Sequence, residues 1–151
     1  MIPQSTANSI FSAFAGKSSY PAPSEVFLGY CSSQPDPVSG AVSGEPATST
    51  GYERLSIKNS YETFFSSASG GIITNSKEIR MPTAKADQGT HYYWFLSASK
   101  TGNCYLYGDL KHKDKTSGEY VAGLTIGEET VPVFYVGKLR ASLDVELPAL
   151  E

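Results

Sequence analysis

Residues 138–147 alternate polar and apolar side chains without interruption. A period of two requires an extended backbone, because only in a strand do successive side chains point to opposite faces. The apolar face must meet a core, and it consists of Leu139, Ala141, Leu143, Val145 and Leu147. The opposite face carries charged and small polar side chains into water. The segment therefore predicts a strand of a sheet that packs on one side only, and we expect substitutions at Ser142 or Asp144 to be tolerated.

Residues 90–98 form the most apolar run of the chain and have no charged face. Such a strand is typical of a sheet covered on both sides, of a surface that docks on another chain, or of an aromatic platform for sugars. A turn at Thr101-Gly102-Asn103 predicts a hairpin with residues 104–111, which extend either surface. The candidate residues for a subunit interface or glycan contact are His91, Tyr92, Trp94, Tyr105 and Tyr107.

The N-terminal segment has the helical spacing i, i+3, i+4, i+7 in its apolar residues, which are Ala7, Ile10, Phe11 and Phe14. This spacing predicts an amphipathic helix over residues 5–16, ending at Gly16. We expect the helix to lie with its apolar stripe over one end of a sheet.

The remaining apolar runs are short and are separated by Gly, Pro, Asn and Ser. They predict further strands at residues 25–31, 52–58, 72–74, 79–81, 119–126 and 131–136. About eight strands at this spacing indicate an all-β fold, a jelly-roll-like β-sandwich with one short N-terminal helix. Residues 32–51 form a long Ser/Gly/Pro loop, which is either a surface loop or a contact arm. We expect residues 1–151 to form a single domain.

The charge and the apolar content of the chain argue against nucleic-acid binding and against a membrane-spanning helix. The net charge of −3 argues against a nucleic-acid binder, which needs a cationic surface. No apolar run reaches the ~20 residues of a membrane-spanning helix. No basic segment followed by an apolar run opens the chain, so we expect no secretory signal and synthesis in a cytoplasm.

Residues that support chemistry are few. Two histidines, His91 and His112, have no metal-ligand spacing around them, and no nucleophile elbow or phosphate-binding loop occurs. Cys31 and Cys104 lie in apolar runs and are interpreted as buried free thiols, with a disulfide as the alternative. We expect no cofactor, no metal and no enzymatic activity.

Several short segments, taken in order, resemble a family of small bacteriophage virion proteins described as tail-fibre-like. They are built from turn and strand residues and run over nearly the whole chain: Ile10-Phe11-Ser12-Ala13-Phe14-Ala15-Gly16, Tyr20-Pro21-Ala22-Pro23, Val26-Phe27-Leu28-Gly29-Tyr30, Pro35-Asp36-Pro37, Gly51-Tyr52-Glu53-Arg54, Ile73-Thr74-Asn75-Ser76, Pro82-Thr83-Ala84, Gly102-Asn103, Gly108-Asp109-Leu110 and Gly137-Lys138-Leu139. The resemblance is specific by the order of these segments rather than by any single motif.

The resemblance implies a structural component of a phage virion, as a tail-fibre-associated or tail-tip subunit that contacts the host surface. A capsid decoration protein on the head exterior and a glycan-binding, lectin-like module are the alternatives. Either virion role implies self-association into a homo-oligomer and docking on other virion proteins. The resemblance supplies no catalytic residues.

Overall fold

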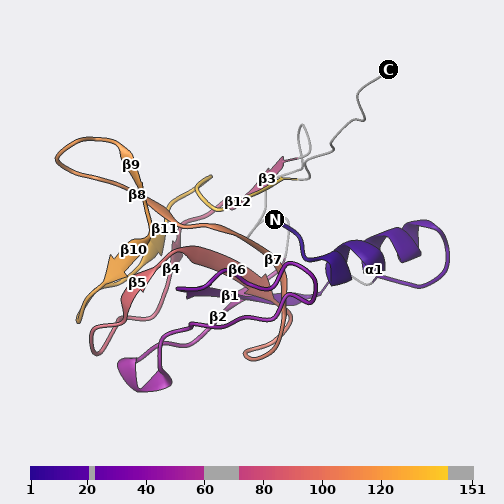
Figure 1. The fold of residues 1–151 in the computed structure, drawn as a ribbon, viewed down its shortest axis with the longest axis horizontal. Coiled ribbons are helices and arrows are strands. Elements are labelled where there is room, and N and C mark those ends of the chain that lie inside the picture. Colours follow the sequence, from indigo (N-terminus) through magenta and orange to yellow (C-terminus); the bar gives the residue numbers. More distant parts are fainter. Residues whose placement is uncertain (21–22, 60–71, 143–151) are drawn as a thin grey trace.

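The computed structural model describes residues 1–20, 23–59 and 72–142, with side chains described up to Arg140. Most of the regular structure in these ranges is β-strand, and they contain one α-helix, at the N-terminal end (Figure 1). The predicted all-β class with a short N-terminal helix is confirmed at this level. The elements are α1 (Gln4–Phe14), β1 (Glu25–Cys31), the 3-10 turn η1 (Thr48–Thr50), β2 (Leu55–Lys58), β3 (Ile72–Thr74), β4 (Ile79–Arg80), β5 (Gly89–His91), β6 (Tyr93–Ser97), β7 (Cys104–Asp109), β8 (Lys111–Lys113), β9 (Tyr120–Ala122), β10 (Leu124–Ile126), β11 (Val133–Phe134) and β12 (Arg140–Ser142).

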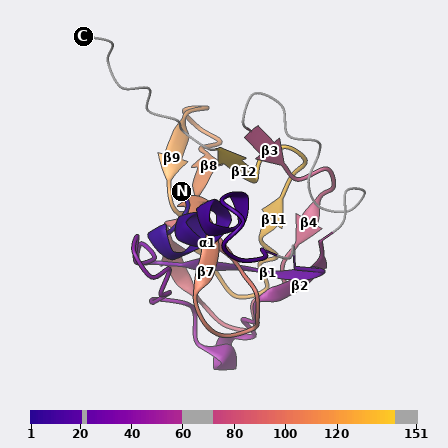
Figure 2. The same cartoon turned by 90° about the vertical axis from the view of Figure 1, so that its right-hand side faces the viewer.

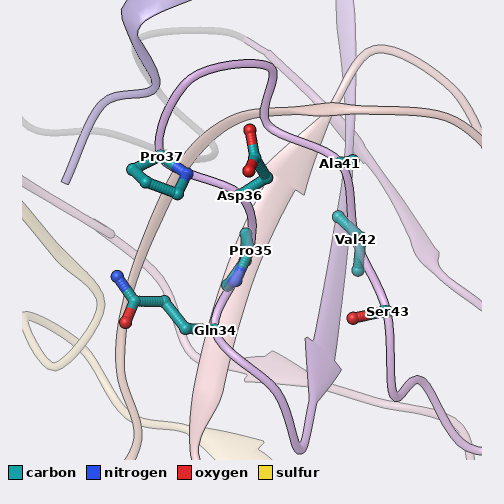
Figure 3. A pocket seen from close by; sticks show the side chains of 7 residues that line it. All are labelled: Gln34, Pro35, Asp36, Pro37, Ala41, Val42 and Ser43. Carbon is teal, nitrogen blue, oxygen red and sulfur yellow. The ribbon is translucent and has the colours of Figure 1, made fainter.

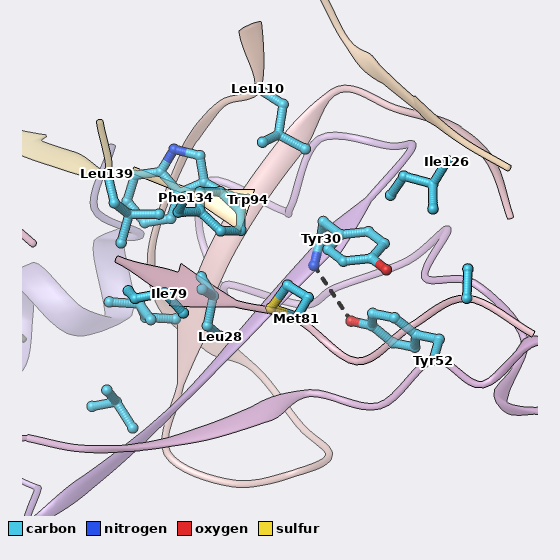
Figure 4. Packing of buried hydrophobic residues seen from close by; sticks show 13 residues of the cluster. Leu28, Tyr30, Tyr52, Ile79, Met81, Trp94, Leu110, Ile126, Phe134 and Leu139 are labelled. Carbon is cyan, nitrogen blue, oxygen red and sulfur yellow. Dashed lines mark hydrogen bonds between the residues drawn. The ribbon is translucent and has the colours of Figure 1, made fainter. Parts of the chain in front are cut away.

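A four-stranded antiparallel sheet of order β2-β1-β6-β7 forms the centre of the fold. All residues of β1 after Glu25 are buried, because both faces of the sheet are covered. One face meets the main core, which brings together residues from several strands and from the segments between them (Figure 4). The buried members of this core include Leu28, Tyr30, Tyr52, Met81, Trp94, Leu96, Ile126, Phe134 and Leu139.

The other strands pair two by two, as β10-β5, β11-β4, β12-β3 and β8-β9. This pairing does not confirm the predicted jelly-roll sandwich. The run predicted as one strand over residues 90–98 is broken at Tyr92, where the chain passes from the β5–β10 pair into the central sheet. The main-chain groups of Tyr92 stay paired across the break, with Cys31 at 3.0 Å and Leu110 at 2.7 Å.

Residues 32–51 cover the second face of the central sheet. Beneath them lies a smaller core of Cys31, Phe95, Cys104 and Tyr107, against which Val42 packs. The loop is tied down by main-chain bonds, among them Cys104 N–H to the Gly40 carbonyl at 2.8 Å. The segment is a loop, as predicted, and hydrogen bonds of its main chain hold it against the central sheet and against itself. A role as a contact arm stays a prediction.

The N-terminal helix is shorter than predicted and projects from the strands (Figures 1 and 2). The expectation that its apolar stripe covers a sheet is wrong. Phe14 is 92% exposed, Phe11 69% and Ile10 39%. The physical reason is that the helix is attached by its first turn, where Pro3 and Thr6 are buried and the Gln4 N–H donates to the Pro37 carbonyl.

The alternating C-terminal segment begins as predicted. Leu139 is buried in the main core, and Arg140–Ser142 pairs with β3 in antiparallel register. Residues 143–147, and with them the expectation for Asp144, lie outside the described residues.

Candidate functional site

The five predicted contact residues do not form one surface. His91, Trp94 and Tyr107 are buried, Trp94 in the main core and Tyr107 in the smaller one. Tyr92 is 45% exposed at the break between β5 and β6. Tyr105 is partly buried on β7. Burial of three of these side chains leaves Tyr92 and Tyr105 as the members that can meet a partner directly.

Tyr105 lies in a small cleft between the start of α1 and the start of β7. The cleft has a volume of about 230 Å³ and is lined by Ser5, Thr6, Ser9, Tyr20, Ser39, Asn103, Cys104 and Tyr105. None of these residues is an acid or a base at neutral pH. Tyr20 and Tyr105 both line this cleft. Burial raises the pKa of Tyr20, and the nearby Tyr105 raises it further. The site offers two aromatic rings beside neutral hydroxyl and amide groups.

A larger open cleft of about 450 Å³ lies within the loop that covers the central sheet (Figure 3). Asp36 is its charged member, but its carboxylate serves the turn that forms the cleft wall. Asp36 Oδ1 accepts bonds from the Ser39 N–H at 2.6 Å, the Ser39 hydroxyl at 2.8 Å and the Val38 N–H at 3.1 Å. These bonds, first those from Ser39, lower the pKa of Asp36. The Asp36 carboxylate therefore stabilises the conformation of the loop.

Arg54, which is not among the predicted contact residues, is the centre of a network of polar contacts. Its guanidinium makes a two-bond contact with Glu45, at 2.9 Å from Nε and 2.7 Å from Nη2. The third nitrogen, Nη1, donates to the Ser97 hydroxyl at 3.0 Å and to the Gly102 carbonyl at 2.9 Å. All three nitrogens are thus used, and the group lies 4.7 Å from the centre of the Phe95 ring.

This centre joins three parts of the chain: the covering loop through Glu45, the β6–β7 turn through Gly102, and the segment before β2. Burial alone lowers the pKa of Arg54, but the hydrogen bonds and charge of Glu45 outweigh it and the pKa is raised. Tyr52 donates to the same carboxylate at 2.7 Å, and burial, followed by this bond, raises its pKa. The Gly-Tyr-x-Arg segment is the sequence signal for this centre, and its geometry serves folding.

His91 is buried in a mixed environment next to Tyr30, with ring centres 5.2 Å apart. Its Nε2 lies 2.9 Å from the Gln88 carbonyl, which can only accept, so Nε2 carries the proton. Nδ1 is buried without a hydrogen-bond partner in the described structure. Burial lowers the pKa of His91, only partly offset by the Gln88 bond.

The His91 environment predicts an acid-sensitive contribution to stability. Because the folded state holds the pKa below the unfolded value of about 6.5, protons bind the unfolded chain first as the pH falls. Stability from this group is complete above the unfolded pKa and is lost on acidification. We expect the free energy of unfolding to fall between pH 7.5 and pH 5.5, and to fall less in His91→Gln, measured by urea titration at both pH values. An equal fall in both proteins would contradict this assignment.

The two cysteines are free and buried, which confirms the interpretation as thiols rather than a disulfide. Burial, followed by the electrostatic effects of Glu45 and Cys104, raises the pKa of Cys31 to about 12. Burial also raises the pKa of Cys104 to about 11. Both sulfurs are therefore protonated near neutral pH, where a thiol is a poor nucleophile and metal ligand.

Within residues 1–20, 23–59 and 72–140, no three His, Cys, Asp or Glu side chains gather as a metal site would require. In the same part of the chain, no helix has the length and apolar character needed to cross a membrane.

A search of curated proteins found no match. The sequence profile of the family described as "Podophage GP4 fiber I protein gp80" matches residues 2–131, which include all the elements from α1 to β10. The match spans most of the chain and confirms the resemblance to phage tail-fibre-like proteins. The chain belongs to the podophage GP4 fiber I protein gp80 family.

Proposed function

We propose that the chain is a structural subunit of a fibre on the tail of a podophage particle, where it associates with other virion proteins and with copies of itself. The family match over residues 2–131 carries this proposal. A tail position, rather than decoration of the head, is favoured by the fibre named in the family description.

The use of the polar groups supports a structural rather than a catalytic role. Arg54 and Glu45 bond each other and thereby join the covering loop to the central sheet. The Asp36 carboxylate accepts hydrogen bonds within a turn, and burial keeps the two cysteine thiols protonated. General acid–base or nucleophilic catalysis needs such groups to face a substrate.

Gold-labelled antibody against the purified chain, applied to intact particles, tests this proposal by electron microscopy. We expect label on fibres at the tail. Label spread over the head would identify a decoration protein instead. Particles without label, although the chain is detected in them after denaturation, would place the chain inside the particle and contradict a fibre role.

A second candidate function, contact with a host-surface glycan, is favoured by the cleft between α1 and β7. Tyr20 and Tyr105 present aromatic rings next to the neutral polar groups of Ser9, Ser39 and Asn103. Aromatic rings pack on the C–H faces of sugars, while hydroxyl and amide groups bond their hydroxyls. The buried Trp94 and Tyr107 are not available for such stacking.

A glycan array probed with wild type, Tyr105→Ala and Tyr92→Ala tests this candidate. We expect at least a tenfold loss of binding in Tyr105→Ala and unchanged binding in Tyr92→Ala, which removes a partly exposed tyrosine outside the cleft. Equal loss in both variants, or no binding of host-surface sugars by wild type, would reject the cleft as a glycan site.

A further inference from the structure

The polar side of α1 faces the protein, and its apolar side faces the solvent. Ser5 and Ser9 line the cleft that faces the strands, and the Ser5 hydroxyl donates to the Ser39 carbonyl at 3.2 Å. With 3.6 residues per turn, Ile10, Phe11 and Phe14 lie on the opposite side of the helix, where they are exposed. A surface helix normally buries its apolar side. In α1 this arrangement is reversed, so an apolar surface is left without a covering element among the described residues.

The attachment of α1 holds this apolar side away from the rest of the protein. The first turn is fixed by bonds from the Gln4 and Ser5 N–H groups to the Pro37 and Val38 carbonyls, both at 2.9 Å. Phe14 lies ten residues further along, about 15 Å from Gln4 at 1.5 Å per residue. Figures 1 and 2 show the helix projecting from one end of the strands. The aromatic side chains are thus carried at the free end of a short arm.

The size of the exposed face limits what can cover it. Phe11 and Phe14 together expose roughly 300 Å² of apolar surface, given the usual area of an aromatic side chain. Ile10 adds a smaller area. A stable interface takes about 800 Å² from each partner. The face is large enough to mark an interaction site but holds a partner only where that partner is kept close.

We propose that the apolar face of α1 docks on the α1 of a second copy of this chain. Residues 1–16 contain no charged side chain, so two identical helices meet without the repulsion that self-contact brings when a face is charged. The same absence of charge gives the face no complementarity to a charged partner. This inference rests on the proposed function, because a fibre keeps copies side by side and so makes a small contact sufficient.

Photocrosslinking of the full chain in solution tests the proposal. Phe14 is replaced by the photoreactive analogue p-benzoylphenylalanine, and copies of natural isotope composition are mixed with ¹⁵N-labelled copies at high concentration. We expect crosslinked peptides that join residues 4–14 of a light copy to residues 4–14 of a heavy copy. Crosslinks that stay within one chain would show that residues outside the described ranges cover the face, and would overturn the proposal.

Sedimentation velocity over a concentration series provides the second readout. Because the face is small, we expect wild type to associate weakly and reversibly, only at the top of a series that reaches about 1 mM, which is comparable to the effective concentration of linked copies. We expect Phe11→Gln with Phe14→Gln to abolish this association. The matched control is Tyr135→Gln with Val136→Gln, an apolar pair that is 62% and 60% exposed elsewhere on the surface. Because all four side chains are exposed, the urea midpoints of both variants should stay near that of wild type.

A wild type that remains monomeric at every concentration overturns the proposal, as does an assembly that the helix variant leaves intact. Crosslinking of Phe14 to a different virion protein in particles, with a monomer in solution, would assign the face to that protein. These outcomes are separate from the gold-labelling result, which can fail or succeed independently of how copies contact each other.

Discussion

Arg54→Met is expected to lower the free energy of unfolding by about 3 kcal/mol, the lower end of the cost of breaking a buried ion pair, because Arg54 is buried while the Glu45 side chain is 25% exposed. Methionine preserves much of the apolar stem, so the loss is mainly electrostatic. The carboxylate of Glu45 keeps only the Tyr52 hydroxyl among the side chains that now bond it. The carbonyl of Gly102 also loses its donor. Urea titration followed by tryptophan fluorescence measures the effect, since urea does not screen charges as guanidinium does.

Lys100→Met provides the control for removal of a cation. Lys100 and Glu53 are 4.0 Å apart, and both side chains are largely exposed. An exposed pair contributes about 0–1 kcal/mol, because water and salt screen it. A loss in Arg54→Met as small as that in Lys100→Met would show that Arg54 is not a folding residue.

A double variant separates the ion pair from the rest of the network. Arg54→Met with Glu45→Gln removes both charges, so no buried charge is left unpaired. We expect the double variant to be less unstable than the sum of the two single variants. Strict additivity would indicate that the two residues act independently, in contradiction to the two-bond contact between them.

Local sequence patterns correctly predicted those elements that depend only on neighbouring residues. The bounds of β1 were predicted as residues 25–31, and the hairpin between β6 and β7 turns at the predicted Thr101-Gly102-Asn103. Both follow from neighbouring residues alone, because a run of apolar residues and a turn sequence are local signals.

The break at Tyr92 could not be predicted in the same way. It depends on β5 pairing with β10, about thirty-five residues away, as in the Thr90–Thr125 register. No glycine or proline occurs at residues 90–98 to mark the change of partner. A continuous apolar run is compatible with one long strand and with two short ones in different sheets.

The helix and the Arg54 centre show two further limits of the sequence. The spacing of Ile10, Phe11 and Phe14 predicted an apolar side correctly, but periodicity does not say what covers that side. Arg54 lies within the strand predicted over residues 52–58, yet its partner carboxylate, that of Glu45, lies nine residues earlier in a loop without periodicity. An arginine in a strand pattern carries no local sign that it is buried.

Trp94→Ala is the second prediction with a large expected effect, a loss of about 3–5 kcal/mol of unfolding free energy, typical of large-to-small core changes. Trp94 is buried in the main core and lies opposite Tyr30 on β1 and Gly108 on β7. Its removal leaves a cavity that three strands border. Tyr92→Ala, two residues earlier and partly exposed, should cost about 1 kcal/mol or less. Because Trp94→Ala also removes the only tryptophan, circular dichroism replaces fluorescence as the readout.

The pairing of Trp94 with Gly108 makes this prediction sharper. A Cβ on Gly108 would lie 2.7 Å from the indole Nε1, so Gly108→Ala alone should destabilise the protein by overpacking. In the Trp94→Ala background that space is empty, and the added methyl group should be neutral or stabilising. The change of sign requires the indole to lie flat against Gly108, as it does in a core residue. Were Trp94 instead a surface contact residue, Gly108→Ala would have the same small effect in both backgrounds, and the core assignment would be wrong.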